Sequence, residues 1–457
     1  MAEIQNQTDM YDTIKSKFKN GLRWNFSGSM IYETIKTFHQ LFLIKFLSVS
    51  LYGLIGSTLS LIYLATKIAD VGTTYSLPPF FHLFTKNKFN FKKLFFKYFL
   101  LPQLPIIIIT AIATTYIYRQ NFVPHAQLLL IVPIIIILET FRSFLRYFLN
   151  FSFKTKTVVI LEVSTFLTYV SFIWFCVLYK HSPVTLKLIL LTHVTESAIV
   201  VSVFSGLVYS MYKKLPDTEN VLDSTIWRRL LNMRLFNYLI RLSKDLFTSN
   251  FLTPFFAFRF GFEQAGFFFF ATNIASSIQS IFKQSVGFSG HALFANLKES
   301  SQAEKKEAFD LLCQKLVHFV APPIIFLLIN YKFIIKLGNT QDPTLLTGAL
   351  VLMFLTIILT EFFLLLYEQF YIIEEATQKL FFFKIFELAL LYLVVMSKAS
   401  SSPLIMLINI TFIRLISFVI IAINAYYLWK IKPRLKPEAK FLTLCVIISI
   451  LFSLLSS

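Results

Sequence analysis

The chain has 457 residues, of which 56% are hydrophobic and only 15% are charged, and its formal net charge is +19. A soluble protein of this length needs a more polar surface, so the composition excludes an ordinary soluble domain. In a soluble protein the positive charge would suggest a nucleic acid partner. Here the lysines and arginines lie mainly in alternate loops between long apolar segments. Because this pattern sets the orientation of membrane proteins, we expect no nucleic acid partner.

Two sets of apolar segments follow one another along the chain. Each segment has about the length that an α-helix needs to cross the hydrocarbon core, and the alternating polarity of spanning strands is not seen. Since the backbone in lipid must satisfy its own hydrogen bonds, we predict helices. The first set of predicted spans is 22–46, 51–77, 95–118, 125–149, 157–179 and 185–211. The second set is 235–258, 264–289, 311–335, 344–370, 378–397 and 403–429, and 440–456 is a candidate thirteenth span.

The basic loops predict the orientation of these spans. Lysines and arginines cluster on one face of the predicted bundle, beginning with Lys15, Lys17 and Lys19, whereas the other face carries few. The positive face of a membrane protein is cytoplasmic. We therefore predict a multi-pass protein of a bacterial inner membrane with a cytoplasmic N-terminus. The loops on both faces are short, so no soluble domain is expected.

The two sets of spans predict a duplicated architecture. The longest polar joint, from Lys213 to Arg234, lies near the middle of the chain and marks a lobe boundary. We predict an all-α polytopic membrane protein with two six-helix lobes in a parallel pseudo-two-fold repeat. The predicted domains are a cytoplasmic N-terminal segment (1–21), an N-lobe (22–212), a cytoplasmic inter-lobe linker (213–234), a C-lobe (235–430), and a basic cytoplasmic loop with the candidate extra helix (431–457).

The halves also resemble each other in detail. The segment from Phe46 to Gly53 has a counterpart from Phe260 to Gly266, and prolines precede an isoleucine run in both halves. The later matches pair Glu139 with Glu361, and Glu162 with Glu387. Chance similarity in a Phe- and Leu-rich sequence is the alternative, but the order of the matches is kept. Since six spans return the chain to the same side, the repeat axis is predicted to run along the membrane normal.

Charged residues inside the predicted spans carry the functional argument. A charge at the bilayer centre costs about 2.5 kcal/mol or more, so such residues face water or a partner. Several lie one turn apart and share a helix face. These groups are Glu33, Lys36 and His39; Lys67 and Asp70; Glu139 and Arg142; His193 and Glu196; and Arg241, Lys244 and Asp245. The charges that stand alone in the sequence are Glu162, Lys283, His318, Glu361, Glu387 and Arg414.

Each pair has two readings that the sequence leaves open. One partner could be released to a charged substrate, or the pair could simply hold two helices together. Arg146 and Glu368, like Lys45, lie near predicted span ends, where we interpret them as snorkelling to the interface. A lone histidine is more often a packing residue than a functional one.

Taken together, the cations predict a basic cavity near the midplane, which suits an anion such as a phosphate or pyrophosphate. The predicted substrate-binding residues are Lys36, His39, Lys67, Arg142, Arg241, Lys244, Lys283 and Arg414. The predicted ion-coupling residues are Glu33, Asp70, Glu139, Glu196, Asp245 and Glu361, and the candidates for a proton path are His39, His193 and His318. We predict no catalytic residue, metal site or cofactor, with H+ or Na+ as the coupling ion.

Enzyme signatures are missing from the sequence. It contains no Walker loop, dinucleotide glycine motif, HExxH, CxxC or GxSxG. The three cysteines are far apart and predict no disulfide or metal framework. A membrane glycan polymerase or ligase remains an alternative, although the outer loops are short for holding a sugar donor.

Two segments carry a resemblance to a known family. FLSVSLYGLIGSTLSLIYLATKIADVGTT (46–74) has its second-half version in FRFGFEQAGFFFFATNIASSIQSIFKQSVGFSGHALFANL (258–297). With the six-plus-six plan, they resemble the multidrug/oligosaccharidyl-lipid/polysaccharide (MOP) exporter superfamily, and most of all its O-antigen and polysaccharide flippase branch.

This resemblance implies a MATE-like fold with two lobes that rock around a central cavity by alternating access. It implies a sugar chain on polyprenyl pyrophosphate as substrate, moved from the inner to the outer leaflet, with basic cavity residues holding the pyrophosphate. The implied partners are this lipid-linked oligosaccharide, membrane lipid, and a polysaccharide polymerase with its export machinery. A cation-coupled multidrug exporter of the same superfamily is the alternative, and its cavity would prefer acids and aromatic rings.

Overall fold

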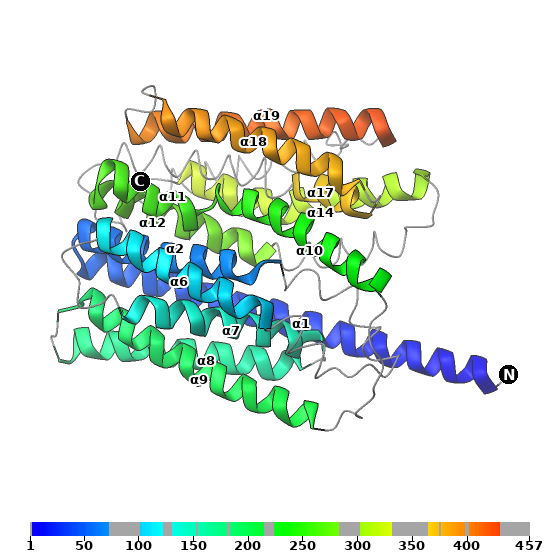
Figure 1. Cartoon of the computed structure of the whole chain (residues 1–457), viewed down its shortest axis with the longest axis horizontal. Coiled ribbons are helices and arrows are strands. Elements are labelled where there is room, and N and C mark those ends of the chain that lie inside the picture. The colour runs from blue at the N-terminus through cyan, green and yellow to red at the C-terminus, as the bar shows by residue number, and fades with distance from the viewer. Residues whose placement is uncertain are drawn as a thin grey trace. The chain divides into compact units, whose positions relative to one another are not determined.

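The computed structural model describes ten stretches of the chain. They are residues 2–72, 101–121, 130–151, 154–180, 183–213, 224–282, 302–330, 364–373, 376–397 and 402–429. Every regular element in these stretches is a helix (Figure 1), which confirms the predicted all-α class for the described residues.

The helices follow the predicted spans closely in most places. In the first half they are α1 (Ala2–Phe46), α2 (Val49–Asp70), α6 (Leu101–Asn121), α7 (Ile131–Phe151), α8 (Thr155–Leu178) and α9 (Leu186–Tyr212). In the second half they are α10 (Ser224–Asp245), α11 (Ser249–Phe260), α12 (Phe262–Phe282), α14 (Gln302–Ile329), α17 (Leu365–Ile373), α18 (Thr377–Met396) and α19 (Pro403–Trp429). Most of the predicted span 344–370 and the whole candidate span 440–456 lie outside the described residues.

The second predicted span is shorter than the sequence suggests. It was expected over 51–77, but α2 ends at Asp70. The next two residues adopt left-handed backbone conformations, with φ of 45° at Val71 and 69° at Gly72. Such φ values terminate a right-handed helix, and glycine adopts them at low cost.

The seventh predicted span is not one helix. The sequence predicts a single span over 235–258, but α10 ends at Asp245 and α11 begins at Ser249. Thr248, directly before α11, has an extended backbone, with φ −92° and ψ 167°. Polar residues such as Arg241, Lys244 and Asn250 alternate with apolar ones in this segment. Such a mixed pattern does not distinguish a continuous helix from a broken one, which is why this prediction was wrong.

Membrane character is clear in four of the described helices, α2, α8, α9 and α19, which are long and apolar enough to cross a bilayer. Helix α19 shows how such a helix is oriented: Ile408, Phe412 and Val419 are exposed, whereas Ile410 and Ile421 are buried. An exposed apolar face of this kind suits contact with lipid tails. Helix α7 has comparable length but carries Glu139, Arg142 and Arg146 in its middle.

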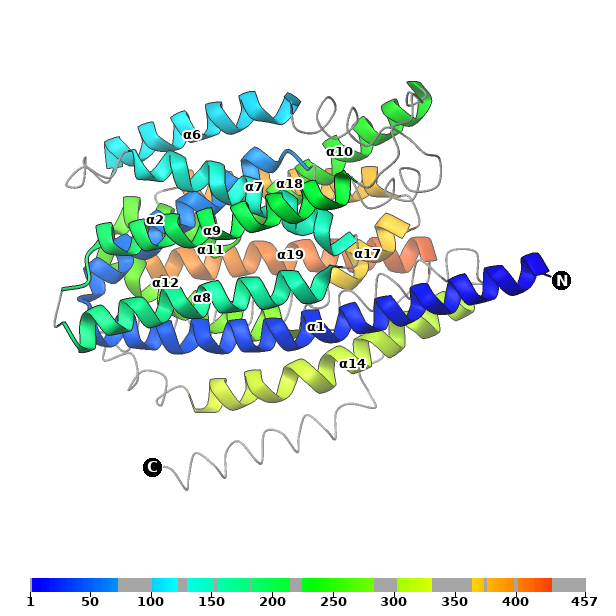
Figure 2. The same cartoon turned by 90° about the horizontal axis from the view of Figure 1, so that it is seen from below.

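The chain divides into two compact units. Unit 1 comprises Met1–Tyr32 and Thr58–Leu246, and unit 2 comprises Glu33–Ser57 and Phe247–Ser457. Helix α1 is continuous through the first division, as Figure 2 shows. These units divide the chain at other points than the predicted lobes, whose boundaries remain predictions.

Each unit has its own packed helices. In unit 1, α7 packs against α6, α8 and α9. In unit 2, α11 packs on α12, and α18 packs on α19 with α17 against both. The buried charged residues described below lie on α7, α8 and α9, on α17, α18 and α19, and on α2 and α10.

Candidate functional site

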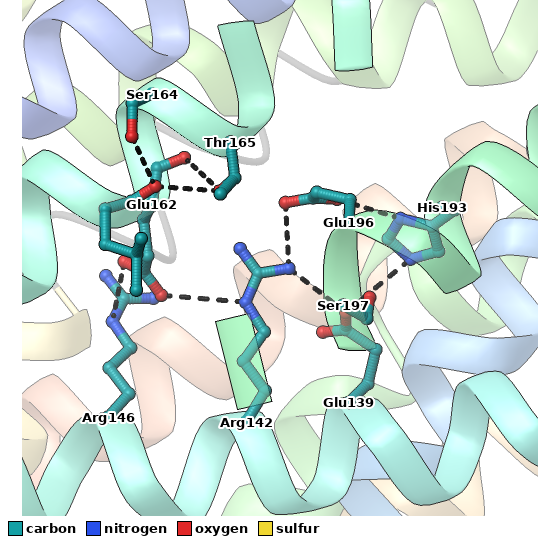
Figure 3. A network of polar contacts seen from close by, with 10 residues as sticks. Glu139, Arg142, Arg146, Glu162, Ser164, Thr165, His193, Glu196 and Ser197 are labelled. Carbon is teal, nitrogen blue, oxygen red and sulfur yellow. Dashed lines mark hydrogen bonds and ion pairs between the residues drawn. The ribbon is translucent and has the colours of Figure 1, made fainter. Parts of the chain in front are cut away.

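A buried group of charged side chains lies between α7, α8 and α9 (Figure 3). We call it the N-half cluster; its members are Glu139, Arg142 and Arg146 from α7, Glu162 from α8, and His193, Glu196 and Ser197 from α9.

Arg142 is the centre of the N-half cluster. Its Nη1 lies 3.1 Å from Glu139 Oε1 and 3.1 Å from Glu196 Oε1, and its Nε lies 3.7 Å from Glu162 Oε1. Arg146 contacts the other oxygen of Glu162 at 3.3 Å. One guanidinium therefore joins carboxylates from three helices, which fixes the helices' relative rotation.

His193 lies between the two carboxylates that Arg142 also contacts. Its Nδ1 is 3.2 Å from Glu196 Oε2, and its Nε2 is 3.7 Å from Glu139 Oε1. The Ser197 hydroxyl donates a 2.5 Å hydrogen bond to Glu139 Oε1. The ring of Tyr63 from α2 meets the His193 ring edge-on, with 6.0 Å between centroids.

The charge of the N-half cluster depends on His193. The described members include three carboxylates and two guanidiniums, so the sum is −1 when the imidazole is neutral and zero when it is protonated. His193 and Glu196 are both 6% exposed, and a buried net charge is costly. A single proton on the imidazole therefore balances the cluster.

A second group of charges joins α2 to α10 within unit 1. We call it the α2–α10 cluster: Lys67 and Asp70 from α2, with Arg234, Arg241, Lys244 and Asp245 from α10. Lys67 Nζ lies 2.6 Å from Asp245 Oδ1. Arg241 lies 3.6 Å from Asp70 and 3.7 Å from Asp245.

Backbone contacts fix the end of α2 in this cluster. Arg234 Nε donates to the Val71 carbonyl at 2.8 Å, and the Tyr238 hydroxyl donates to the Ile68 carbonyl at 3.1 Å. Gln103 from α6 donates to the carbonyls of Ala69 and Asp70. The carbonyl groups that a helix end leaves without helical partners are thereby satisfied.

The α2–α10 cluster has more positive than negative groups, and two of the positive ones, Lys67 and Arg241, are nearer the surface than the carboxylates. Its six members sum to +2. The side chains of Lys67 and Arg241 are 27% and 25% exposed, whereas those of Asp70 and Asp245 are 8% and 9% exposed. Two partly exposed cations backed by buried carboxylates could bind an anion that competes with those carboxylates.

A third group, the C-half cluster, lies between α17, α18 and α19 in unit 2. Lys384 Nζ is 3.0 Å from Glu368 Oε1 and 2.8 Å from Glu387 Oε2, and Arg414 Nη1 is 2.6 Å from Glu387 Oε1. No side chain of the four is more than 3% exposed. The cluster holds two cations and two ionised carboxylates, so its net charge is zero and no additional proton is needed to balance it.

The remaining predicted site residues are dispersed. Glu33 and Lys36 pair at 3.2 Å on α1, and His39 on the same helix is 2% exposed; all three belong to unit 2. His318 is exposed on α14 and contacts the Gln314 carbonyl at 2.9 Å. Lys283 and Glu361 lie outside the described residues.

Some of the clustered residues were missed or misread from the sequence. Glu162, Glu387 and Arg414 were classed as isolated, but all three have ion-pair partners on other helices. Glu368 was interpreted as snorkelling, but it is 2% exposed. Lys384 was not singled out, although its spacing of three from Glu387 is the signal used for the other pairs.

Comparison with known proteins is informative only at the level of structure. No protein-family model matches the sequence, and no curated protein matches it. A multidrug resistance MATE family transporter of the MOP superfamily in its outward-facing conformation superposes with a TM-score of 0.60 at 13% identity. That alignment covers 90% of this chain and 96% of the other. The chain has the fold of the MOP superfamily transporters.

Two further structures lead to the same fold. An inward-facing conformation of a MATE family transporter of the MOP superfamily gives a TM-score of 0.55 at 13% identity, covering 89% of this chain and 94% of the other. A MOP superfamily transporter from Pyrococcus furiosus, for which reverse polarity of the binding pocket suggests a different function, gives 0.56 at 11% identity. That alignment covers 90% of this chain and 96% of the other. The predicted all-α, MATE-like fold is therefore confirmed, whereas the division into two six-helix lobes remains a prediction.

Proposed function

We propose that the protein is a membrane transporter that moves a polyprenyl-pyrophosphate-linked oligosaccharide from the inner to the outer leaflet of a bacterial inner membrane. The observation that carries this proposal is the excess of positive charge in the α2–α10 cluster. The MOP fold supports the transport class, because the similar structures are all transporters of that superfamily.

The α2–α10 cluster suits a pyrophosphate group for a specific reason. Lys67 and Arg241 each contact an aspartate but keep about a quarter of their side chains exposed. A pyrophosphate brings several acceptor oxygens and can replace Asp70 and Asp245 as the partner of both cations. The carboxylates would pair with the cations again when the substrate leaves, so Lys67 and Arg241 have an anionic partner both with and without substrate.

Coupling to an ion is assigned to the N-half cluster in this proposal. An unperturbed histidine changes its charge near neutral pH, and one proton on His193 would balance the cluster's charge. Tyr63 contacts the His193 ring from α2, the same helix that carries Lys67 one turn later. A change in the charge of His193 would therefore act on the helix that carries Lys67, one of the two proposed substrate cations.

A multidrug exporter is the second candidate function. The N-half cluster has carboxylates beside the aromatic rings of Tyr63 and Tyr169, and such an arrangement binds organic cations. Two of the similar structures are multidrug resistance MATE family transporters. Against this candidate, the charge of the α2–α10 cluster would repel a cation.

The proposal is tested by alanine substitutions in living cells. Lys67→Ala, Arg241→Ala and Lys244→Ala should each reduce export of a surface polysaccharide. A charge-assisted contact contributes about 1.5–3 kcal/mol, which corresponds to about tenfold or more. Lys187→Ala removes an exposed lysine elsewhere and should leave export unchanged. Normal export in all three cluster variants, with folded protein present, would contradict the proposal, and altered cationic-dye efflux with intact polysaccharide would favour the multidrug candidate.

A further inference from the structure

The break in the seventh predicted span coincides with a passage of the chain from one compact unit to the other. Helix α10 ends at Asp245, unit 1 ends at Leu246, and α11 begins at Ser249 in unit 2. The chain also passes between the units within α1 and within α2, where the helix continues without interruption. Among these three passages, only the one at Leu246 lies at a helix break.

The backbone hydrogen bonds show where the two helices separate. The Leu246 N–H donates to Leu242 at 3.2 Å and closes α10, whereas the Phe251 and Leu252 N–H groups donate to Thr248 and open α11. The turn from Leu246 to Thr248 thus separates the two helical ladders. A few residues outside regular structure can absorb the dihedral changes of a hinge.

Phe247 is held firmly on the side of unit 2. The side chain is 5% exposed, and the Arg414 guanidinium lies over its ring at 4.1 Å from the centroid. A desolvated guanidinium over an aromatic face is an attractive contact with defined geometry. The middle residue of the break is therefore fixed to α19.

Arg414 is itself fixed by the C-half cluster. It lies 2.6 Å from Glu387, which lies 2.8 Å from Lys384, which in turn lies 3.0 Å from Glu368. These contacts join α17, α18 and α19 around the guanidinium. The cluster is neutral and at most 3% exposed, so it is suited to holding Arg414 in place.

The residue just before the break is fixed on the side of unit 1. Asp245, the last residue of α10, contacts Lys67 at 2.6 Å and Arg241 at 3.7 Å, and all three belong to unit 1. The break is consequently a short connection whose two ends are anchored in different units.

We propose that Leu246–Thr248 is a hinge of the transport cycle and that Arg414 is the positioning residue that anchors its Phe247 side. Substrate transport is the part of the inference that rests on the proposed function; the anchoring of Phe247 does not depend on it. This role for Arg414 differs from the substrate contact predicted from the sequence, because its guanidinium is occupied by Glu387 and by the Phe247 ring.

The hinge is tested by distances between spin labels on α10 and α11 in the full chain. The labels replace Leu235 and Phe258, which are 54% and 70% exposed, in a background without the three cysteines. Phe247→Leu keeps an apolar side chain and leaves every charge paired, but removes the ring under Arg414. We expect it to broaden the distance distribution by about twofold, whereas Phe247→Tyr, which keeps the ring, should match the parent protein.

Two results would overturn the hinge: unchanged distributions in Phe247→Leu, or the same broadening in Phe247→Tyr. If Phe247→Leu does not fold, Phe247→Met is measured against the same criteria. These spectra need no substrate, so they distinguish a failed hinge from a wrong substrate assignment.

Transport kinetics distinguish a positioning role of Arg414 from a direct role in substrate binding. Arg414→Lys keeps a cation beside Glu387 but loses the planar group over Phe247. A positioning role predicts a lower kcat for transport of the lipid-linked oligosaccharide with an unchanged KM. A raised KM with an unchanged kcat would instead assign Arg414 to the substrate and contradict the inference.

Discussion

At the scale of single residues, His193 has the arrangement expected of a proton carrier. It lies between Glu139 and Glu196, which also contact Arg142, so its charge changes the balance of the whole N-half cluster. The charged groups around it come from α7 and α9, and Tyr63 from α2 supplies a ring rather than a charge. One residue can thus determine whether this buried cluster is neutral.

Substitution of His193 tests whether its protonation couples transport to a proton gradient. In His193→Gln the cluster keeps a charge of −1 as long as its three carboxylates are ionised, so a proton gradient should no longer drive transport. Proteoliposomes with an imposed pH difference should show gradient-driven transport for the parent protein and a loss of about tenfold or more for the variant, the size expected for an essential proton-transfer group. Ser197→Ala, which removes a hydrogen bond to Glu139 but no titrating group, should keep the response to the gradient. Gradient-driven transport by His193→Gln, or transport that follows a sodium gradient instead, would contradict the assignment.

The spacing of charged residues along the sequence predicted some of these contacts and missed others. The pairs Glu139–Arg142 and His193–Glu196 were expected from their spacing of three and do contact each other. Lys67 and Asp70 share a face as expected, but each forms an ion pair with α10. Spacing along one helix carries no information about which other helix lies opposite, so contacts between helices could not be predicted.

At the scale of elements, α2 and α12 approach each other closely in the described part of unit 2. A Cβ on Gly53 would collide with the Phe262 carbonyl and the Gly266 backbone, and a Cβ on Gly266 would collide with the Val49 carbonyl. Small residues allow such approach between membrane helices. Gly53 and Gly266 also end the matching segments of the two halves, so repeat-related residues lie in contact here.

Substitution at this close crossing of α2 and α12 should be severe. Gly53→Ala should force α2 away from α12 and lower both folded yield and transport, with transport per folded molecule falling about tenfold, because backbone atoms cannot yield as flexible side chains do. Gly206→Ala is a matched control, since nothing lies within 4 Å of an added Cβ at that site. Fluorescence-detected size exclusion gives the yield, and a transport assay on the folded fraction gives the activity. Equal values for the two variants would contradict the tight crossing.

Helix ends were predicted correctly where the composition of the sequence changes sharply, and they were missed where it does not. The spans of α8, α9 and α19 agree with their predictions within a few residues. The end of α2 at Asp70 and the break after Asp245 lie in stretches where polar and apolar residues are mixed, so mean hydropathy does not mark either boundary. Both features depend on local backbone conformation and on partners from other helices.

At the scale of the whole molecule, Glu162 and Glu387, which match in the predicted repeat, have similar surroundings. Glu162 on α8 binds Arg142 from the preceding helix α7, and Glu387 on α18 binds Arg414 from the following helix α19. The two clusters differ in charge: one contains a histidine that can change its balance, whereas the other is neutral and fixed. We infer that the halves of the repeat have taken different roles, one for coupling and one for anchoring the hinge.

The central claim is that the cations of the α2–α10 cluster bind the pyrophosphate of a lipid-linked oligosaccharide, and leaflet-to-leaflet movement in proteoliposomes tests it most directly. Two fluorescent lipids are compared that carry the same oligosaccharide, one through pyrophosphate and the other through an uncharged linker. The account predicts rapid movement of the pyrophosphate lipid by the parent protein, little movement of the uncharged lipid, and loss of the difference in the double variant Lys67→Ala/Arg241→Ala. Equal movement of both lipids by the parent protein, or an unchanged preference in the double variant, would contradict it.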